Sequence, residues 1–207
     1  MAGTPLTNPI AWTTPKVYNS SGATLAAADW NTLANDVAVV YAKPFMLINQ
    51  QSAVTPTATG YVLFQSGVTV GQTTNSPASG AGAITYSASG SSLSAPITGL
   101  YRISCAVTLA AATSTAADAN IQAIGQNGVT SNVTFSGSYA QGDANQSTST
   151  LSFIYPMQAS GTSSPTQPTS WFFKIIYHGT VGTLPAGSAT NFITWASLEY
   201  LGSSGNY

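Results

Sequence analysis

Short runs in which apolar and polar residues alternate fill the chain from Phe45 onward, and Gly, Pro and Asn separate one run from the next. Alternation with a period of two is typical of strands that bury one face. The predicted strands cover residues 45–48, 61–64, 84–87, 99–109, 119–126, 133–139, 148–158, 170–177 and 192–201. Asn127-Gly128, between two of these runs, predicts a tight hairpin turn. Many short strands without an internal repeat predict a mainly β, antiparallel sandwich of the jelly-roll type.

The pattern before Pro44 has the period of a helix instead. Apolar residues recur there at spacings of three and four, which gives one apolar stripe. The stripe consists of Trp30, Leu33, Val37 and Val40 or Tyr41. We therefore predict one amphipathic helix that begins after Thr24 and ends at Pro44, preceded by an extended arm. These elements divide the chain into residues 1–44 and a β domain, residues 45–207. The stripe needs a partner, which is either the β domain or another chain.

Charged residues make up only 4% of the 207 residues, and the formal net charge is −1. An ordinary soluble domain carries about 25%. Because there is no basic patch, we expect neither nucleic acid nor a membrane as a partner. A net charge near zero favours association between protein surfaces. The chain shows no signal-peptide pattern and no apolar run of the roughly 20 residues that span a membrane, so we expect synthesis in a cytoplasm without export by that route.

The side chains that usually carry catalysis or bind metals are few and scattered. Cys105 lies in an apolar run, which favours a buried hydrophobe over a nucleophilic thiol. His178 follows a predicted strand, which favours a position in a turn or at the rim of the domain, although the sequence also permits a Ser/His/Asp triad. Asp118 and Asp143 lie in polar loops, where a turn position is favoured over a metal site between subunits. We expect no catalytic residue, no metal and no cofactor.

Two further groups of residues have structural interpretations. Arg102 and Glu199 stand inside predicted strands, and a pair between them would satisfy both charges in an apolar setting. Aromatic residues in the C-terminal part either fill the core or a threefold axis, or form a flat platform for a sugar. That platform would consist of Trp171, Phe173, Tyr177, Trp195 and Tyr200.

Several segments of the β half follow the order of a known family. A Gly-Leu-Tyr strand is followed by a strand that ends in Asn-Gly, a Leu-rich strand, an aromatic strand and a final Phe-x-small-x-x-Leu strand. They begin at Gly99, Ile121, Ser149, Trp171 and Asn191. The order resembles the trimeric globular head of the complement first component, which is related to the tumour-necrosis-factor fold. The resemblance covers about residues 80–202 and implies a jelly roll that forms a homotrimer. It departs from the family before the aromatic strand, where a Ser/Pro-rich stretch after Gly161 replaces the usual Gly-Asp.

Residues 12–43 resemble a different group of proteins. Trp12-Thr-Thr-Pro leads to Gly22-Ala-Thr-Leu-Ala-Ala-Ala-Asp29-Trp-Asn31, and Asp36 follows. A Trp/Pro arm, a Leu-Thr-Ala-Ala-Asp-Leu-Asn helix and a later Asp are similar to the opening of many tailed-bacteriophage structural proteins. Tail fibres, minor tail proteins and head decoration proteins share this opening. The resemblance implies a virion component without fixing head or tail.

Together these features predict a non-enzymatic, homotrimeric accessory or decoration protein of a phage, made in the host bacterial cytoplasm and located on the virion surface. Its partners would be its own copies and other virion proteins, such as major capsid or tail proteins. The alternative is a tail fibre or minor tail protein that binds a host-surface receptor or glycan, with loops 73–82, 110–118 and 159–169 facing outward. The candidate attachment residues are Trp12, Trp30, Leu33, Val37 and Tyr41. The candidate trimer or core aromatics are Tyr101, Trp171, Phe173, Tyr177, Phe192 and Trp195.

Overall fold

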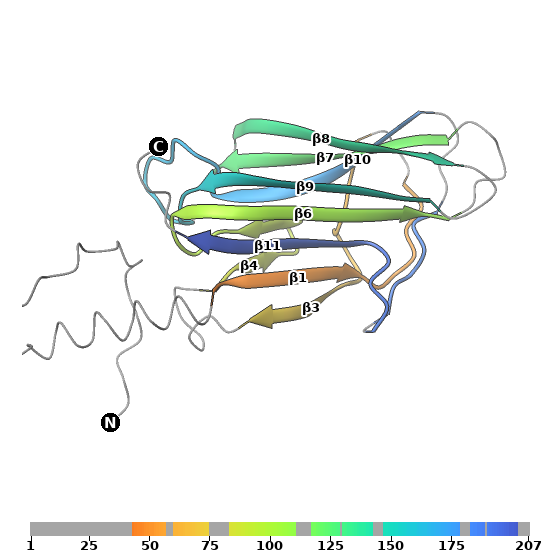
Figure 1. Cartoon of the computed structure of the whole chain (residues 1–207), viewed down its shortest axis with the longest axis horizontal. Coiled ribbons are helices and arrows are strands. Elements are labelled where there is room, and N and C mark those ends of the chain that lie inside the picture. Colours follow the sequence, from red (N-terminus) through yellow and green to blue (C-terminus); the bar gives the residue numbers. More distant parts are fainter. Residues whose placement is uncertain are drawn as a thin grey trace, which may run out of the picture.

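Two antiparallel β-sheets form the part of the chain that the computed structural model describes. That part comprises residues 43–56, 60–74, 83–110, 117–128, 130–142, 147–178, 183–188 and 190–202. The five-stranded sheet has the order β3-β1-β11-β6-β9, and Figure 1 shows these strands side by side. Its strands are β1 (Phe45–Gln50), β3 (Val68–Thr74), β6 (Gly99–Leu109), β9 (Ser147–Met157) and β11 (Trp195–Gly202).

Five strands of the six-stranded sheet have the order β4-β5-β10-β7-β8, and the sixth, β2, pairs with β10. Its strands are β2 (Tyr61–Val62), β4 (Thr85–Ser87), β5 (Ser92–Ser94), β7 (Ala117–Asn127), β8 (Thr130–Gly142) and β10 (Ser170–His178). The last pair of β7 and β8 is Asn127 with Thr130. Gly128 between them has a φ of +82°, a conformation that glycine adopts without strain. The predicted hairpin turn is confirmed.

The strand order is that of a jelly roll. When β1 and the strands β5 to β11 are counted as one to eight, the two sheets run 1-8-3-6 and 2-7-4-5. This is the double Greek-key arrangement in which strands from both halves of the chain alternate in each sheet. The predicted mainly β, antiparallel jelly-roll sandwich is confirmed. One consequence is that β1 lies beside β11, so the chain enters the sandwich next to its last strand.

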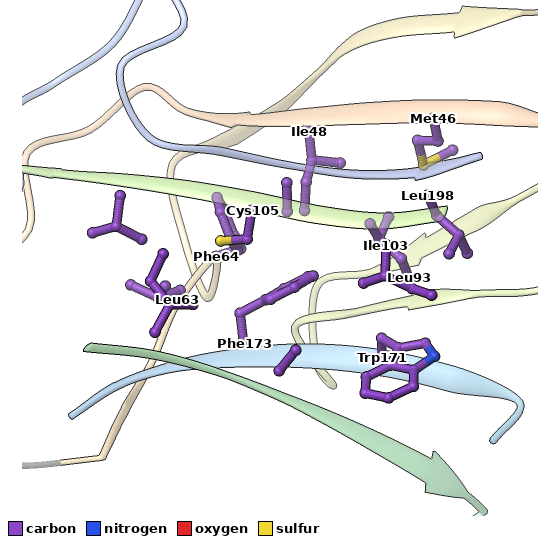
Figure 2. Packing of buried hydrophobic residues seen from close by; sticks show 14 of the residues in the cluster. Met46, Ile48, Leu63, Phe64, Leu93, Ile103, Cys105, Trp171, Phe173 and Leu198 are labelled. Carbon is purple, nitrogen blue, oxygen red and sulfur yellow. The ribbon is translucent and has the colours of Figure 1, made fainter. Parts of the chain in front are cut away.

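The core lies between the two sheets because alternate residues of each strand point inward. In β6, Tyr101, Ile103 and Cys105 are at most 1% exposed, whereas Arg102 between them faces outward. In Figure 2, Phe173 of β10 points from the opposite sheet toward Ile103 and Cys105, and Trp171 lies on the same strand. Phe173 also meets the ring of Phe64 edge-on, with centroids 6.1 Å apart. The core is therefore continuous from one sheet to the other.

The sequence pattern missed β3 and β5 and misplaced several strand ends. β3 extends to Thr74, so the loop predicted at 73–82 was wrong at its first two residues. β5 has one apolar residue, Leu93, and a strand this short shows no period. The predicted strand 192–201 begins only at Trp195, since the carbonyl of Ile193 accepts from the Thr108 side chain and the carbonyl of Thr194 accepts from the backbone N–H of Gln50. The predicted strand 61–64 ends at Val62.

Two other loop predictions have different outcomes. The predicted loop 110–118 was wrong at residues 117–118, where β7 begins. Residues 159–169 contain no strand, as expected. The predicted arm and helix lie outside the described residues. Among the described residues, no helix is long and apolar enough to cross a membrane.

Candidate interaction surfaces

The outer surface of the five-stranded sheet, which we call the sheet face, holds a single ion pair. Its strands contribute only two charged residues, Arg102 and Glu199, which are cross-strand partners in β6 and β11. Arg102 Nη1 lies 2.8 Å from Glu199 Oε2, and the two side chains are 49% and 32% exposed. The predicted pair is confirmed, but its predicted apolar setting was wrong because both residues face solvent. Pairs of this exposure stabilise a fold by less than about 1 kcal/mol.

Neutral hydroxyl groups line the sheet face from its middle to one end of β6 and β9. Ser104 Oγ and Ser152 Oγ are 2.8 Å apart across β6 and β9. Thr108 Oγ1 lies 2.8 Å from Thr148 Oγ1 on the same two strands, and it donates to the carbonyl of Ile193 at 2.9 Å. Because these hydroxyls satisfy one another, the surface is polar without net charge. Such a surface is cheap to desolvate in contact with another protein.

Apolar side chains border this polar centre at two places. Ile154, in register with Arg102 on β9, is 55% exposed. Phe45 and Leu47 lie on β1 and are half-buried. Their outward direction follows from the burial of Met46 and Ile48, the inward residues of the same strand.

A cluster of aromatic rings, which we call the aromatic edge, lies between β8 and β9, the last strands of the two sheets. Phe135 and Phe153 stack with centroids 4.3 Å apart and an interplanar angle of 19°. Tyr155 meets Phe135 edge-on at 5.6 Å, and all three rings are half-buried. Gly137 permits this close approach, because a Cβ there would lie 2.8 Å from Leu151 Cβ. The aromatic edge is therefore a partly exposed apolar surface at the side of the sandwich.

Hydrogen bonds fix the Ser/Pro-rich loop 159–169 to its neighbours. Gln158 Oε1 accepts the backbone N–H groups of Thr166 at 2.6 Å and Gln167 at 2.8 Å. Asn127 Nδ2 donates to the carbonyl of Pro165 at 3.0 Å, which ties the loop to the β7–β8 turn. Residues 160–164 remain exposed. The loop therefore presents a defined surface at one end of the sandwich.

The positions of Cys105, His178, Asp118 and Asp143 can be compared with the predictions as far as the structure describes them. Cys105 is 1% exposed, and burial raises the pKa of its thiol far above the ordinary value. The backbone register places His178 opposite Asp118 across β10 and β7, a proximity that their sequence separation did not indicate. The side chains of these two residues, and Asp143 as a whole, lie outside the described part. Within the described part, no group of three His, Cys, Asp or Glu side chains gathers to bind a metal.

The predicted site residues fall into three groups. Trp12, Trp30, Leu33, Val37 and Tyr41 lie outside the described residues. Tyr101, Trp171 and Phe173 are buried in the core, at 0 to 1% exposed. Phe192 and Trp195 are half-buried, and the side chain of Tyr177 is not described.

The position of the C-terminal aromatics limits the sugar-platform interpretation. Trp171, Phe173 and Tyr200 are at most 5% exposed, so they offer no flat face to a ligand. Tyr101 and Tyr200 instead meet each other edge-on at 5.3 Å inside the core. The partly exposed rings are those of the aromatic edge, which the sequence did not single out. The alternation Leu151-x-Phe153-x-Tyr155 indicated a strand, but not that this strand lies at the side of the sheet.

The comparisons with known proteins are limited to solved structures. No family model matches the chain, and no curated protein matches it. The chain is similar to Eiger TNF from S. frugiperda, at 7% identity and a TM-score of 0.48, over 79% of this chain and 96% of that one. It is similar to murine APRIL at pH 5.0, at 12% identity and a TM-score of 0.47, over 77% of this chain and 99% of that one. The jelly-roll assignment rests on the strand order described above.

Proposed function

We propose that this chain is a non-enzymatic structural protein of a tailed-bacteriophage virion, where it forms a homotrimer and decorates the particle surface. The observation that carries the self-association is the aromatic edge, together with Ile154, which is exposed on the outer side of the same last strand, β9. Apolar surfaces at the side of a small domain are typical of contacts between protein chains. The low charge of the chain supports the same proposal, because few charges have to be desolvated on assembly.

The virion role is supported by the resemblance of residues 12–43 to phage structural proteins. We propose that residues 1–44 attach the protein to the particle, with Trp12, Trp30, Leu33, Val37 and Tyr41 as apolar anchors. The partner would be a major capsid or tail protein. This segment precedes β1, so the attachment point would lie next to a strand of the five-stranded sheet.

A second candidate function is contact with a host-surface receptor or glycan, as in a tail fibre or minor tail protein. The loop 159–169 favours it, because it is held by hydrogen bonds, is exposed at residues 160–164, and loops on a stable scaffold often carry recognition. Decoration and receptor binding make different predictions. Replacing Ser160, Ser163 and Ser164, which are exposed, with Lys leaves infection unchanged if the protein is decorative, and it reduces adsorption if the loop binds a receptor.

Two measurements test the proposal. Light scattering of the purified chain at micromolar concentration should give three times the monomer mass. Ile154→Glu should reduce the measured mass to that of one chain. The matched control is Ser136→Glu, which places the same charge at an exposed position on the other sheet and should leave the trimer intact. A wild-type monomer would overturn the self-association.

Imaging of labelled virions tests the location. A C-terminal label spread over the head supports decoration, and a label at the tail supports the receptor-binding alternative. Absence of the label from intact particles, when the chain is expressed during infection, would refute a virion role.

A further inference from the structure

Three apolar side chains on the sheet face lie near the point where the chain enters the sandwich. We call them the N-terminal patch; they are Phe45 and Leu47 of β1 and Leu100 of β6, and all three are half-buried. Phe45 and Glu199 are cross-strand partners, and so are Glu199 and Arg102. The patch therefore spans the neighbouring strands β1, β11 and β6 around the Arg102–Glu199 pair.

The segment that precedes β1 begins directly beside this patch. The backbone N–H of Tyr200 donates to the carbonyl of Pro44 at 2.8 Å, and Lys43 Nζ lies 3.5 Å from the carbonyl of Leu201. These bonds hold residues 43–44 against β11. The 42 residues before them thus start at the border of the patch, and they include the apolar stripe of the predicted helix.

We propose that the apolar stripe of the same chain docks on the sheet face when the protein is free, with Val37 on the N-terminal patch and Leu33 near Ile154 of β9. A helix rises about 1.5 Å per residue, so Val37 lies about 10 Å and Leu33 about 16 Å from Pro44 along a helix. Neighbouring strands are about 4.8 Å apart, so β1 to β6 spans about 10 Å and β1 to β9 about 14 Å. A helix that crosses the strands from Phe45 therefore brings Val37 to β6 and Leu33 to β9.

The pair leaves the sheet face without net charge, but Arg102 can make one further polar contact with the same occupant. Residues 24–42 contain two charges, Asp29 and Asp36, and both are negative. Arg102 is 49% exposed, and its guanidinium retains N–H donors beyond the Nη1 group that faces Glu199. Asp36 adjoins Val37, so a stripe docked through Val37 brings a carboxylate to the side of the sheet that holds Arg102.

The tether favours the same chain over a second copy. Few residues separate Val37 from the fixed Lys43, so the effective concentration of the stripe at its own patch is in the millimolar range. A separate copy in a micromolar solution competes poorly with that value, and the crosslinking experiment distinguishes the same chain from a neighbour within a trimer. This inference is independent of the proposed virion role, because it concerns the free chain alone.

Chemical crosslinking tests the proposal directly. Thr32→Cys, which flanks the stripe, is combined with Ser152→Cys, an exposed position on β9 in the sheet face. The matched control combines Thr32→Cys with Ser136→Cys, which is exposed on the outer surface of the other sheet. The native thiol of Cys105 is buried and gives no background. A short bismaleimide is applied at low micromolar concentration, and denaturing gels separate crosslinks within one chain from crosslinks between chains.

We expect an intramolecular product at least five times more abundant for Ser152→Cys than for Ser136→Cys, and a loss of that difference on adding Leu47→Ser. Circular dichroism verifies that each variant retains the β-sheet signal. Equal yields for the two pairs would overturn the proposal. A product that forms only between differently tagged chains would assign the patch to a second copy instead, which also overturns it.

Discussion

The stacked rings of Phe135 and Phe153 should stabilise the sandwich beyond their apolar area, and a double-mutant cycle measures this contribution. The rings lie 4.3 Å apart at 19°, and Phe153 also meets Trp171 edge-on at 5.0 Å. Replacing each Phe with Leu keeps an apolar side chain of similar size, so the stacking energy is the main loss. Each single substitution should cost about 1–1.5 kcal/mol, since both rings are half-buried. The coupling energy of the cycle should be about 0.5–1.5 kcal/mol.

The assay is urea unfolding of the wild type, the two single variants and the double variant, followed by far-UV circular dichroism. Each is measured at two protein concentrations tenfold apart, because association would make the apparent stability depend on concentration. The control cycle pairs Phe135→Leu with Phe45→Leu, which lies on the outer surface of the opposite sheet. The effects of that pair should add to within about 0.5 kcal/mol. A coupling energy below about 0.3 kcal/mol for Phe135 and Phe153, at either concentration, would show that the stacking makes no contribution of its own.

Three further predictions follow from other contacts. Burial holds the pKa of the Cys105 thiol above its ordinary value of 9.0, so the folded state keeps the proton that the unfolded state loses. The free energy of unfolding should therefore be constant below about pH 8 and fall above pH 9 by up to about 1.4 kcal/mol per pH unit. In unfolding titrations, Cys105→Ala should reduce that slope. Gly137→Val should cost about 1–3 kcal/mol, because a Cβ at Gly137 would lie 2.8 Å from Leu151 Cβ, whereas Ser136→Val, which faces solvent, should change the midpoint in urea little. Arg102→Gln should lower stability by less than about 1 kcal/mol, and 1 M NaCl should abolish the difference between the variant and the wild type.

The alternation of apolar and polar residues was sufficient to predict the long strands and the class of fold. β6 was predicted with its observed bounds, because Tyr101, Ile103 and Cys105 alternate with outward residues and a glycine marks the first residue of the strand. β5 could not be predicted in this way. Its strand character comes from pairing with β4 and β10, which are distant in sequence, and a three-residue segment has no period of its own.

The candidate surfaces were harder to predict than the fold. Alternation separates the two faces of a strand, but it does not say which face lies against the other sheet or which strand is last in its sheet. Trp171 and Phe153 both belong to aromatic strands, yet Trp171 lies at 0% exposed in the core and Phe153 lies in the half-exposed aromatic edge. The difference arises from strand order, because β10 is an inner strand and β9 is the last of its sheet. Strand order depends on long-range pairing, which local patterns do not encode.

The two proposed surfaces lie on different strands, but they approach each other at β9. The aromatic edge belongs to β8 and β9, whereas the N-terminal patch spans β1, β11 and β6, and a helix that crosses the sheet face from there reaches Ile154 of β9. A docked stripe therefore covers part of the surface proposed for self-association. If the stripe later anchors the protein on a virion, it must leave the patch, and the energy of docking then opposes attachment. Attachment would therefore need a partner that binds the stripe more tightly than the patch does, which makes the N-terminal patch a means of limiting premature association of the free chain.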